Sequence, residues 1–372
     1  MILALILFLL IFSFLIISHE GGHFLMAKRA GVEVEEFGIG YPPRIFGKKI
    51  KGTIYSINWI PFGGFVKIYG EDLNRESLRD KNSFYNQSPK VKSSILLAGV
   101  IANFLIAIVL FYVYLGFNDF QSFQTQIFDY HFPFGDQEVY PAVSYVVEGS
   151  PAQDAGIQPS DLVLSFNGAK VYNREQLIEE IDNNKGQEVS LLLENIREQK
   201  QREVTALLRE EKSEEQGVLG VGLTDVTELR YRGGEKLFAG FLHALNIGHF
   251  SLAAMGHLIK VSFQEKNIEP LSQSVSGPVG ILAFTKLSMD AGFWQLIYFV
   301  AIISLALGII NILPIPAADG GRMMFVLYEV IFAKKPPLKL EQSVNLIGFW
   351  FLIVLLFLVT YKDIIQFKDI LF

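Results

Sequence analysis

Long uncharged runs alternate with charged segments along this chain, and these runs are the first indication of its fold. Four of them contain no Asp, Glu, Lys or Arg: residues 1–18, 93–118, 291–318 and 342–361. A helix needs about 20 apolar residues to cross the hydrocarbon core of a bilayer, so each run predicts a transmembrane helix. The first run lacks the basic start and small-residue cleavage site of a signal peptide and continues into His19 and Glu20. We therefore expect a retained span over residues 1–27.

A fifth uncharged run, residues 237–259, is also long enough to cross, but the polar residues in and around it follow a helical period. At about 100° per residue they fall on one side of a helix; they are Glu235, Lys236, His243, Asn246, His249, His257 and Lys260. This pattern predicts an amphipathic helix over residues 235–261 that lies at the membrane interface. The three histidines could form a second metal site, but their shared polar face favours solvated interfacial residues.

The distribution of basic residues predicts the orientation. Residues 28–92, between the first two spans, contain twelve Lys and Arg residues. Short loops rich in Lys and Arg stay in the cytoplasm, so we expect this loop inside and the N-terminus outside. Four spans then place residues 119–290 outside.

Two segments between the spans have strand-forming patterns. Residues 53–60 and 65–69 are rich in β-branched and aromatic residues and flank Pro61-Phe62-Gly63-Gly64, which predicts a membrane-associated β-hairpin at about residues 53–69. Residues 138–225 combine short strands, turn residues and a helical stretch at 173–181. This second pattern predicts a small mixed α/β domain of roughly 85 residues.

The composition supports a membrane protein and narrows its chemistry. Of 372 residues, 51% are hydrophobic and only 19% are charged, with a mean hydropathy of +0.34, which excludes an ordinary soluble chain. A net charge of −6 without a basic stripe argues against nucleic-acid binding. The absence of cysteine excludes disulfides, zinc thiolates and a catalytic thiol, so any metal has to be bound by His, Asp or Glu.

The clearest chemical motif is His19-Glu20-Gly21-Gly22-His23 at the end of the first apolar run. H-E-x-x-H on a helix places both imidazoles on one face, where they can bind one metal ion, with the glutamate beside the metal-bound water as a general base. The alternative is a helix end with two interfacial histidines. An acid and two histidines next to an apolar run are costly to bury without a partner, and a metal ion would be such a partner.

A third ligand is needed, and Asp319 is the candidate. It ends the third apolar run in the sequence Asn311-Ile312-Leu313-Pro314-Ile315-Pro316-Ala317-Ala318-Asp319-Gly320. The alternative is an Asp-Gly turn at a membrane exit. His19, His23 and Asp319 share a membrane side only if an odd number of spans lies between them, and the predicted topology places one there.

These motifs resemble the bacterial site-2 proteases, the RseP-like intramembrane zinc metalloproteases, over essentially the whole chain. That family has H-E-x-x-H in its first span and N-x-x-P-x-P-x-L-D-G in its third. Here Asn311, Pro314, Pro316, Asp319 and Gly320 match in register, and Ala318 replaces the leucine. Residues 276–281 (Ser-Gly-Pro-Val-Gly-Ile) and Gly99 with Asn103 agree as well. The resemblance implies a polytopic α-helical membrane protein with four transmembrane helices, a cytoplasmic-side β-hairpin and one extracytoplasmic PDZ-like domain.

The resemblance also implies an activity and its partners. One Zn²⁺ per chain would be held by His19, His23 and Asp319 in the inner (plasma) membrane of a bacterium, with Glu20 as the catalytic base. Expected substrates are single-span membrane proteins, such as anti-sigma factors or remnant signal peptides, already cut outside by a site-1 protease. Asn311 would hold the substrate or its oxyanion, or only cap the bend before Pro314. The hairpin would pair with an extended substrate or only plug the cytoplasmic mouth; its pairing residues would be Phe65, Val66, Lys67, Ile68 and Tyr69.

Two other classes of protein are weighed against the protease. A catalytically silent scaffold would act through its PDZ-like domain, but it has no need for an intact set of His19, Glu20, His23 and Asp319. A transporter or channel would line a path with buried ionisable residues, but four spans without a pair of inverted, interrupted helices argue against it. Metal content distinguishes both classes from the protease.

Overall fold

The computed structural model describes residues 1–71, 80–196, 200–211 and 217–371. It consists of two compact units. The first, Met1–Tyr114 together with His243–Phe372, is mostly helical, and we call it the helical unit. The second, Leu115–Leu242, is built around a β-sheet, and we call it the sheet unit.

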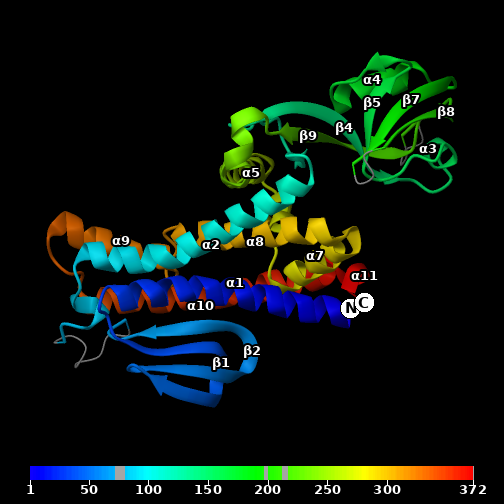
Figure 1. Cartoon of the computed structure of the whole chain (residues 1–372). Coiled ribbons are helices and arrows are strands. Elements are labelled where there is room, and N and C mark those ends of the chain that lie inside the picture. Colours follow the sequence, from blue (N-terminus) through cyan, green and yellow to red (C-terminus); the bar gives the residue numbers. More distant parts are fainter. Residues whose placement is uncertain (72–79, 197–199, 212–216, 372) are drawn as a thin grey trace. The chain divides into compact units, whose positions relative to one another are not determined.

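Four long helices of the helical unit overlap the four predicted runs. They are α1 (Ile2–Arg29), α2 (Pro89–Phe117), α8 (Phe293–Ile312) and α10 (Leu338–Gln366). Each is long and apolar enough to cross a membrane, because an α-helix satisfies its backbone hydrogen bonds internally and can carry apolar side chains all round. In Figure 1 all four run across the view.

The count of candidate spans differs from the predicted four. Among the described residues a fifth helix meets the same criteria, Gly233–Glu265, which comprises η2 (Gly233–Phe238) and α5 (Ala239–Glu265). Figure 1 shows α5 nearly end-on, across the direction of the other four. The expected solvated polar face is wrong for its first turns, because His243 and Asn246 are fully buried. His243 contacts Tyr298 (Nε2 to Oη, 3.1 Å) and the ring of Phe111.

The third predicted span, 291–318, is also corrected. The chain forms α6 (Glu269–Ser274) and α7 (Pro278–Ala291), turns at Gly292, and then forms α8, which already ends at Ile312. Pro314 and Pro316 follow, and proline cannot continue a helix. A new helix, α9 (Asp319–Phe332), begins at Asp319, and α11 (Lys368–Leu371) follows α10. Asp319 is therefore the first residue of a helix and not the end of a span.

The predicted hairpin of residues 53–60 with residues 65–69 is wrong, although a β-sheet does form in this loop. Strand β1 (Val34–Ile50) pairs with β2 (Thr53–Ile68), and the reversal is at Lys51 and Gly52, both with positive φ. The register pairs Phe37 with both Tyr55 and Val66, so residues 53–60 and 64–68 lie on opposite sides of β1 and do not pair with each other. The Pro61–Gly64 segment carries the chain from one side of β1 to the other. Residues 64–68 consequently form an outer edge.

The sheet unit is an antiparallel sheet with two helices. The strand order among the described residues is β3-β9-β4-β5-β7-β8, and β6 pairs with β5. The elements are β3 (Gln121–Gln126), β4 (Asp136–Val146), α3 (Pro151–Asp154), β5 (Asp161–Phe166), β6 (Ala169–Lys170), α4 (Arg174–Asn183), β7 (Glu188–Asn195), β8 (Lys200–Leu207) and β9 (Val221–Arg230). Its main core includes Phe166, Leu177 and Leu191. The sheet extends beyond the predicted 138–225, because β3 pairs with the second half of β9.

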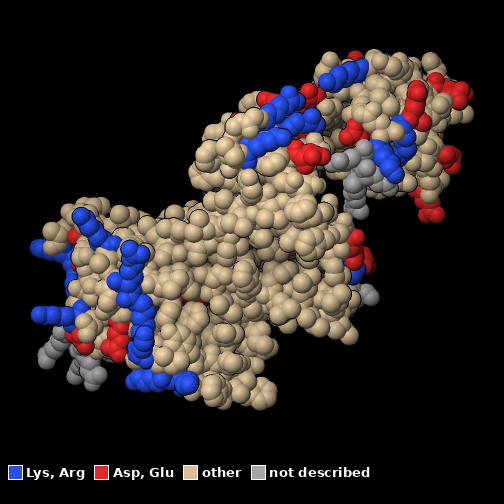
Figure 2. All heavy atoms as spheres, viewed as in Figure 1, with Lys and Arg blue, Asp and Glu red and all other residues tan. Residues whose placement is uncertain are grey.

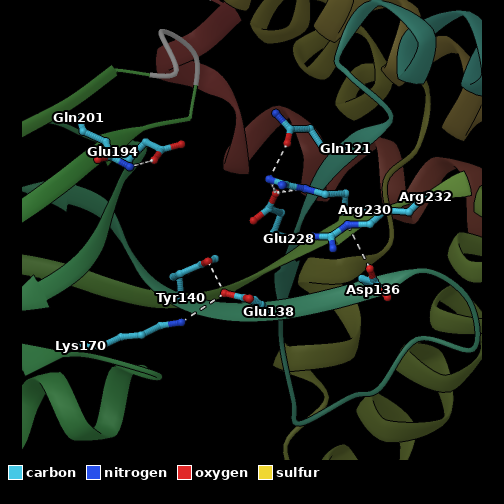
Figure 3. A network of polar contacts seen from close by, with 10 residues as sticks. All are labelled: Gln121, Asp136, Glu138, Tyr140, Lys170, Glu194, Gln201, Glu228, Arg230 and Arg232. Carbon is cyan, nitrogen blue, oxygen red and sulfur yellow. Dashed lines mark hydrogen bonds and ion pairs between the residues drawn. The ribbon is translucent and has the colours of Figure 1, made fainter.

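Polar side chains on β3, β4, β6 and β9 contact one another (Figure 3). Glu138 accepts hydrogen bonds from Tyr140 and Lys170, and Arg230 binds Glu228 and Gln121. Lys170, Glu138 and Arg230 are 44–60% exposed at their side chains. Exposed ion pairs contribute at most about 1 kcal/mol each, so the backbone ladder and the apolar core hold this unit together.

The charges of the helical unit gather at one end. Figure 2 shows Lys and Arg side chains over the end where α9 lies, followed by a broad uncharged surface over the long helices. A broad uncharged surface next to an end rich in Lys and Arg is typical of a protein that spans a bilayer.

Candidate metal centre

Two of the three candidate ligands lie one helical turn apart on α1. His19 and His23 are 8% and 6% exposed, and their Nε2 atoms are 3.0 Å apart. Residues i and i+4 share a helix face, which is why the H-E-x-x-H spacing makes the two rings converge. The Nδ1 atom of His23 lies 2.8 Å from the backbone oxygen of Ile95. When the ring proton is on Nδ1 and is donated to this oxygen, the lone pair of Nε2 is free to bind a metal.

The third candidate ligand arrives from 300 residues away. Asp319 Oδ2 lies 2.9 Å from His19 Nε2 and 3.2 Å from His23 Nε2. The loop before it folds tightly over the start of α9: a Cβ on Gly320 or Gly321 would collide with the backbone oxygens of Leu313 or Ile315. Only glycine fits at both positions, so the Asp-Gly-Gly sequence brings the carboxylate to the histidines.

The charge state of Asp319 suits a metal ligand. Burial by itself would raise its pKa, but hydrogen bonds and charge interactions with His19 and His23 outweigh burial and lower the pKa to about 2. The carboxylate is therefore ionised at neutral pH, as a metal ligand must be.

These three residues fit a metal ion. Their ligand atoms lie within 4.8 Å of one another, and the three pairwise distances are 2.9, 3.0 and 3.2 Å. Tetrahedral zinc binds its ligands at about 2.0–2.2 Å, which places neighbouring donor atoms roughly 3.3 Å apart. Two imidazoles and one carboxylate are a donor set of catalytic zinc sites and leave a fourth position open.

A close approach of α1 and α2 confines the two imidazoles. A Cβ on Gly99 of α2 would lie 2.6 Å from His23 Cε1 and 2.8 Å from His19 Nε2, and a Cβ on Gly22 would collide with the backbone of Ala98. Side chains at these two glycines are excluded. The missing Cβ atoms therefore let α2 cover the ligand face of α1.

Glu20 lies beside the ligands and contacts the hairpin. Its Oε2 accepts a hydrogen bond of 3.1 Å from the backbone N–H of Val66. Residues 64–68 form the outer edge of the sheet, so this backbone N–H points away from β1. The contact joins the candidate base to the candidate substrate-binding strand.

A cavity of about 550 Å³ contains this group. Its lining includes His19, Glu20, His23 and Asp319, and, of the other predicted site residues, Asn311, Phe65, Val66, Lys67 and Ile68. Tyr69 is absent from the lining, and its backbone is already paired, since its N–H donates to Glu33 and its oxygen accepts from Phe84. The backbone oxygen of Ile68 also accepts from the N–H of Glu71, so the open strand edge is shorter than predicted.

Three polar residues around the ligands were given no role from the sequence, although Asn103 was noted as a family match. Arg322 and Glu71 form an ion pair at the cavity wall, and Asn103 Nδ2 lies 3.3 Å from His19 Nδ1. Arg322 follows Asp319 by three positions, a spacing that shares a helix face. Asn103 is a buried amide within an uncharged run, and polar residues within spans are usually functional. No motif or pattern in the sequence pointed to Glu71.

Comparison with known proteins decides the family. The family model of peptidase family M50 matches residues 7–355. The chain belongs to peptidase family M50. A predicted zinc metalloprotease of Clostridium acetobutylicum is 33% identical over 358 residues, or 96% of each chain. The zinc metalloproteases RasP of Shouchella clausii and Geobacillus kaustophilus are 28% and 26% identical, and the alignments cover at least 96% of this chain and 97% of each relative.

Membership in M50 confirms the predicted family and enzyme class. The chain is an M50 zinc metalloprotease, and its long apolar helices make it a multi-pass membrane protein. The scaffold and transporter alternatives are therefore set aside.

Proposed function

We propose that this M50 protease hydrolyses peptide bonds within the transmembrane segments of single-span membrane proteins. The observation that carries this proposal is the convergence of His19, His23 and Asp319 beside Glu20 in a cavity of the helical unit. The helix that carries the H-E-x-x-H motif is itself a candidate membrane span. A hydrolytic site built on such a helix is placed to reach bonds at membrane depth.

The three ligands would hold one Zn²⁺. The chemistry that zinc supplies when bound is Lewis-acid activation of a water molecule and of a peptide carbonyl. Glu20 would accept the proton of the attacking water and return it to the leaving amine, a contribution of about 10² to 10⁴-fold in rate. Asn311 lines the same cavity and would donate its amide to the substrate backbone or to the developing oxyanion.

The edge strand would hold the substrate in an extended form. A transmembrane helix hides its peptide bonds in internal hydrogen bonds and has to unwind before cleavage. The backbone N–H of Val66 faces outward and is held by Glu20, whereas the backbone oxygen of Ile68 already accepts from the N–H of Glu71. A substrate strand pairing there by β-addition would take the N–H of Val66 from Glu20. Substrate binding would then free the carboxylate to act as the base.

The sheet unit and α5 would control what reaches this site. We expect the sheet unit to be PDZ-like, to lie outside the cytoplasm and to exclude substrates that still carry a bulky outer domain. An upstream site-1 protease would remove that domain first, and anti-sigma factors or remnant signal peptides fit this order. α5 would lie at the interface. The Lys and Arg end of the helical unit would face the cytoplasm of a bacterial inner (plasma) membrane, as the positive-inside rule requires.

Glu20→Gln tests the mechanism, because it removes the base but no ligand. The full-length chain in detergent or liposomes is given a single-span reporter, and cleavage is measured together with zinc content. We expect wild-type zinc content and a loss of cleavage of at least about 10²-fold. Glu265→Gln is the control, because Glu265 is an exposed acid at the end of α5 and is not part of the cavity lining. Full cleavage by Glu20→Gln would refute the mechanism, and a wild type that cuts only soluble peptides would refute the substrate class.

A further inference from the structure

Asn103 has an unusual position behind the metal ligands. It lies on α2, is 1% exposed, and its amide nitrogen is 3.3 Å from Nδ1 of His19, on the side of the ring opposite the ligand atom Nε2. Its amide oxygen is buried and has no hydrogen-bond partner within the described part of the chain. A buried acceptor without a partner costs free energy and calls for a physical explanation.

The tautomer of His19 explains this unpaired oxygen. A neutral imidazole carries one proton, and a metal bound at Nε2 requires that proton to be on Nδ1. Nδ1 then needs an acceptor, and the amide nitrogen that faces it is a donor. The opposite tautomer, with the proton on Nε2 and directed at Asp319, accepts the amide N–H but cannot bind a metal at Nε2.

Rotation of the amide resolves this conflict. A half-turn exchanges the oxygen and the nitrogen of Asn103 within nearly the same volume. The oxygen then accepts from Nδ1–H of His19. Either orientation makes one hydrogen bond to the ring, and the amide oxygen has no other partner to lose, so the rotation sacrifices no hydrogen bond.

We propose that Asn103 is a positioning residue that selects the metal-binding tautomer of His19 through its amide oxygen. It would do for His19 what the backbone oxygen of Ile95 does for His23. Both ligand rings would then have an acceptor at Nδ1 and a free lone pair at Nε2. The inference rests on the proposed zinc site.

The test measures the zinc affinity of the full-length detergent-purified chain by competition with a chelator. Asn103→Leu removes the acceptor and is expected to weaken zinc binding by about 10- to 100-fold, as loss of a partner behind a metal ligand usually does. Asn103→Asp restores an acceptor and is expected to bind zinc at least as tightly as the wild type. Ser304→Ala is the matched control: the Ser304 hydroxyl donates to the backbone oxygen of Asn103 (2.8 Å), so this variant perturbs the same packing but keeps the amide. Its zinc affinity is expected to stay within about twofold of the wild type.

The outcomes separate this inference from the proposed function. A wild type without zinc affinity refutes the zinc site itself. Two results refute the role of Asn103 alone. In the first, Asn103→Leu keeps the zinc affinity of the wild type. In the second, Asn103→Asp or Ser304→Ala loses as much zinc affinity as Asn103→Leu does. If Asn103→Leu fails to fold, nitrogen-15 spectra of the histidine-labelled, zinc-bound wild type decide. We expect His19 to be ligated through Nε2 with a proton on Nδ1, and ligation through Nδ1 would overturn the inference.

Discussion

Gly99→Ala should break the metal site without removing a ligand. The added Cβ would lie 2.6 Å from His23 Cε1 and 2.8 Å from His19 Nε2, whereas ordinary van der Waals contact begins at 3.4 Å. The rings, or α2 itself, have to move by about 0.8 Å to relieve the contact with His23 and about 0.6 Å to relieve that with His19, because packed interiors leave little free space. Metal–ligand distances tolerate only about 0.2 Å. We therefore expect zinc affinity to fall by at least about 10-fold, the lower end for disturbing a ligand's support.

The assay for Gly99→Ala needs a control for the substitution itself. Gly116→Ala lies on the same helix, and its Cβ would meet no atom within 4 Å. Alanine in place of an unhindered helical glycine is neutral or stabilising by up to about 1 kcal/mol. We expect Gly116→Ala to keep wild-type zinc affinity and thermal stability. Gly99→Ala should lose affinity, and overpacking should destabilise it by about 1–3 kcal/mol. Unchanged zinc affinity in Gly99→Ala would refute the close approach of α2 to the histidines.

Three further predictions concern the third ligand, the topology and a buried ion pair. Asp319→Asn should lower zinc occupancy as well as cleavage, and full occupancy by elemental analysis would place the third ligand elsewhere. Single cysteines at Lys81 and Asn183 of this cysteine-free chain should react with an impermeant thiol reagent from opposite sides of the membrane; labelling from one side would overturn the topology. Lys92→Met should destabilise the fold by about 1.5–3 kcal/mol, the usual contribution of a hydrogen bond to a charged group, because it leaves Glu329, 14% exposed at its side chain, without the cation 2.7 Å away. Adding Glu329→Leu should recover most of this loss in thermal unfolding, and an unchanged midpoint in the single variant would show that the pair contributes nothing.

The sequence pattern predicted the structure correctly wherever that structure depends on one continuous stretch of the chain. The long uncharged runs predicted α1, α2 and α10, because such a run is stable in a bilayer only as a helix. The H-E-x-x-H spacing predicted that His19 and His23 converge, because helix geometry alone places i and i+4 on one face. Asp319 was a candidate because it ends the third apolar run and the predicted topology places it on the same membrane side as the two histidines.

Local patterns failed where the partner of a segment was remote. The hairpin turn was placed at Pro61–Gly64 because the flanking residues favour strands, but residues 53–60 and 64–68 each pair with β1 instead. The polar residues of α5 suggested a solvated face, but α2 and α8 pack over its start and bury His243. In both cases the structure depends on contacts with a segment that is distant in the sequence. The hydrophobic and polar pattern of one stretch carries no information about such contacts.

The sequence by itself thus determined which residues are chemically able to bind a metal, and which helices are apolar enough to span a membrane. Only the tertiary structure decided that Asp319 lies 2.9 Å from His19, that Gly99 leaves room for both rings, and that Val66 holds Glu20. The physical reason is that helical periodicity orders neighbours within one turn, whereas contacts between residues 300 positions apart depend on how loops, glycines and packed helices close around them.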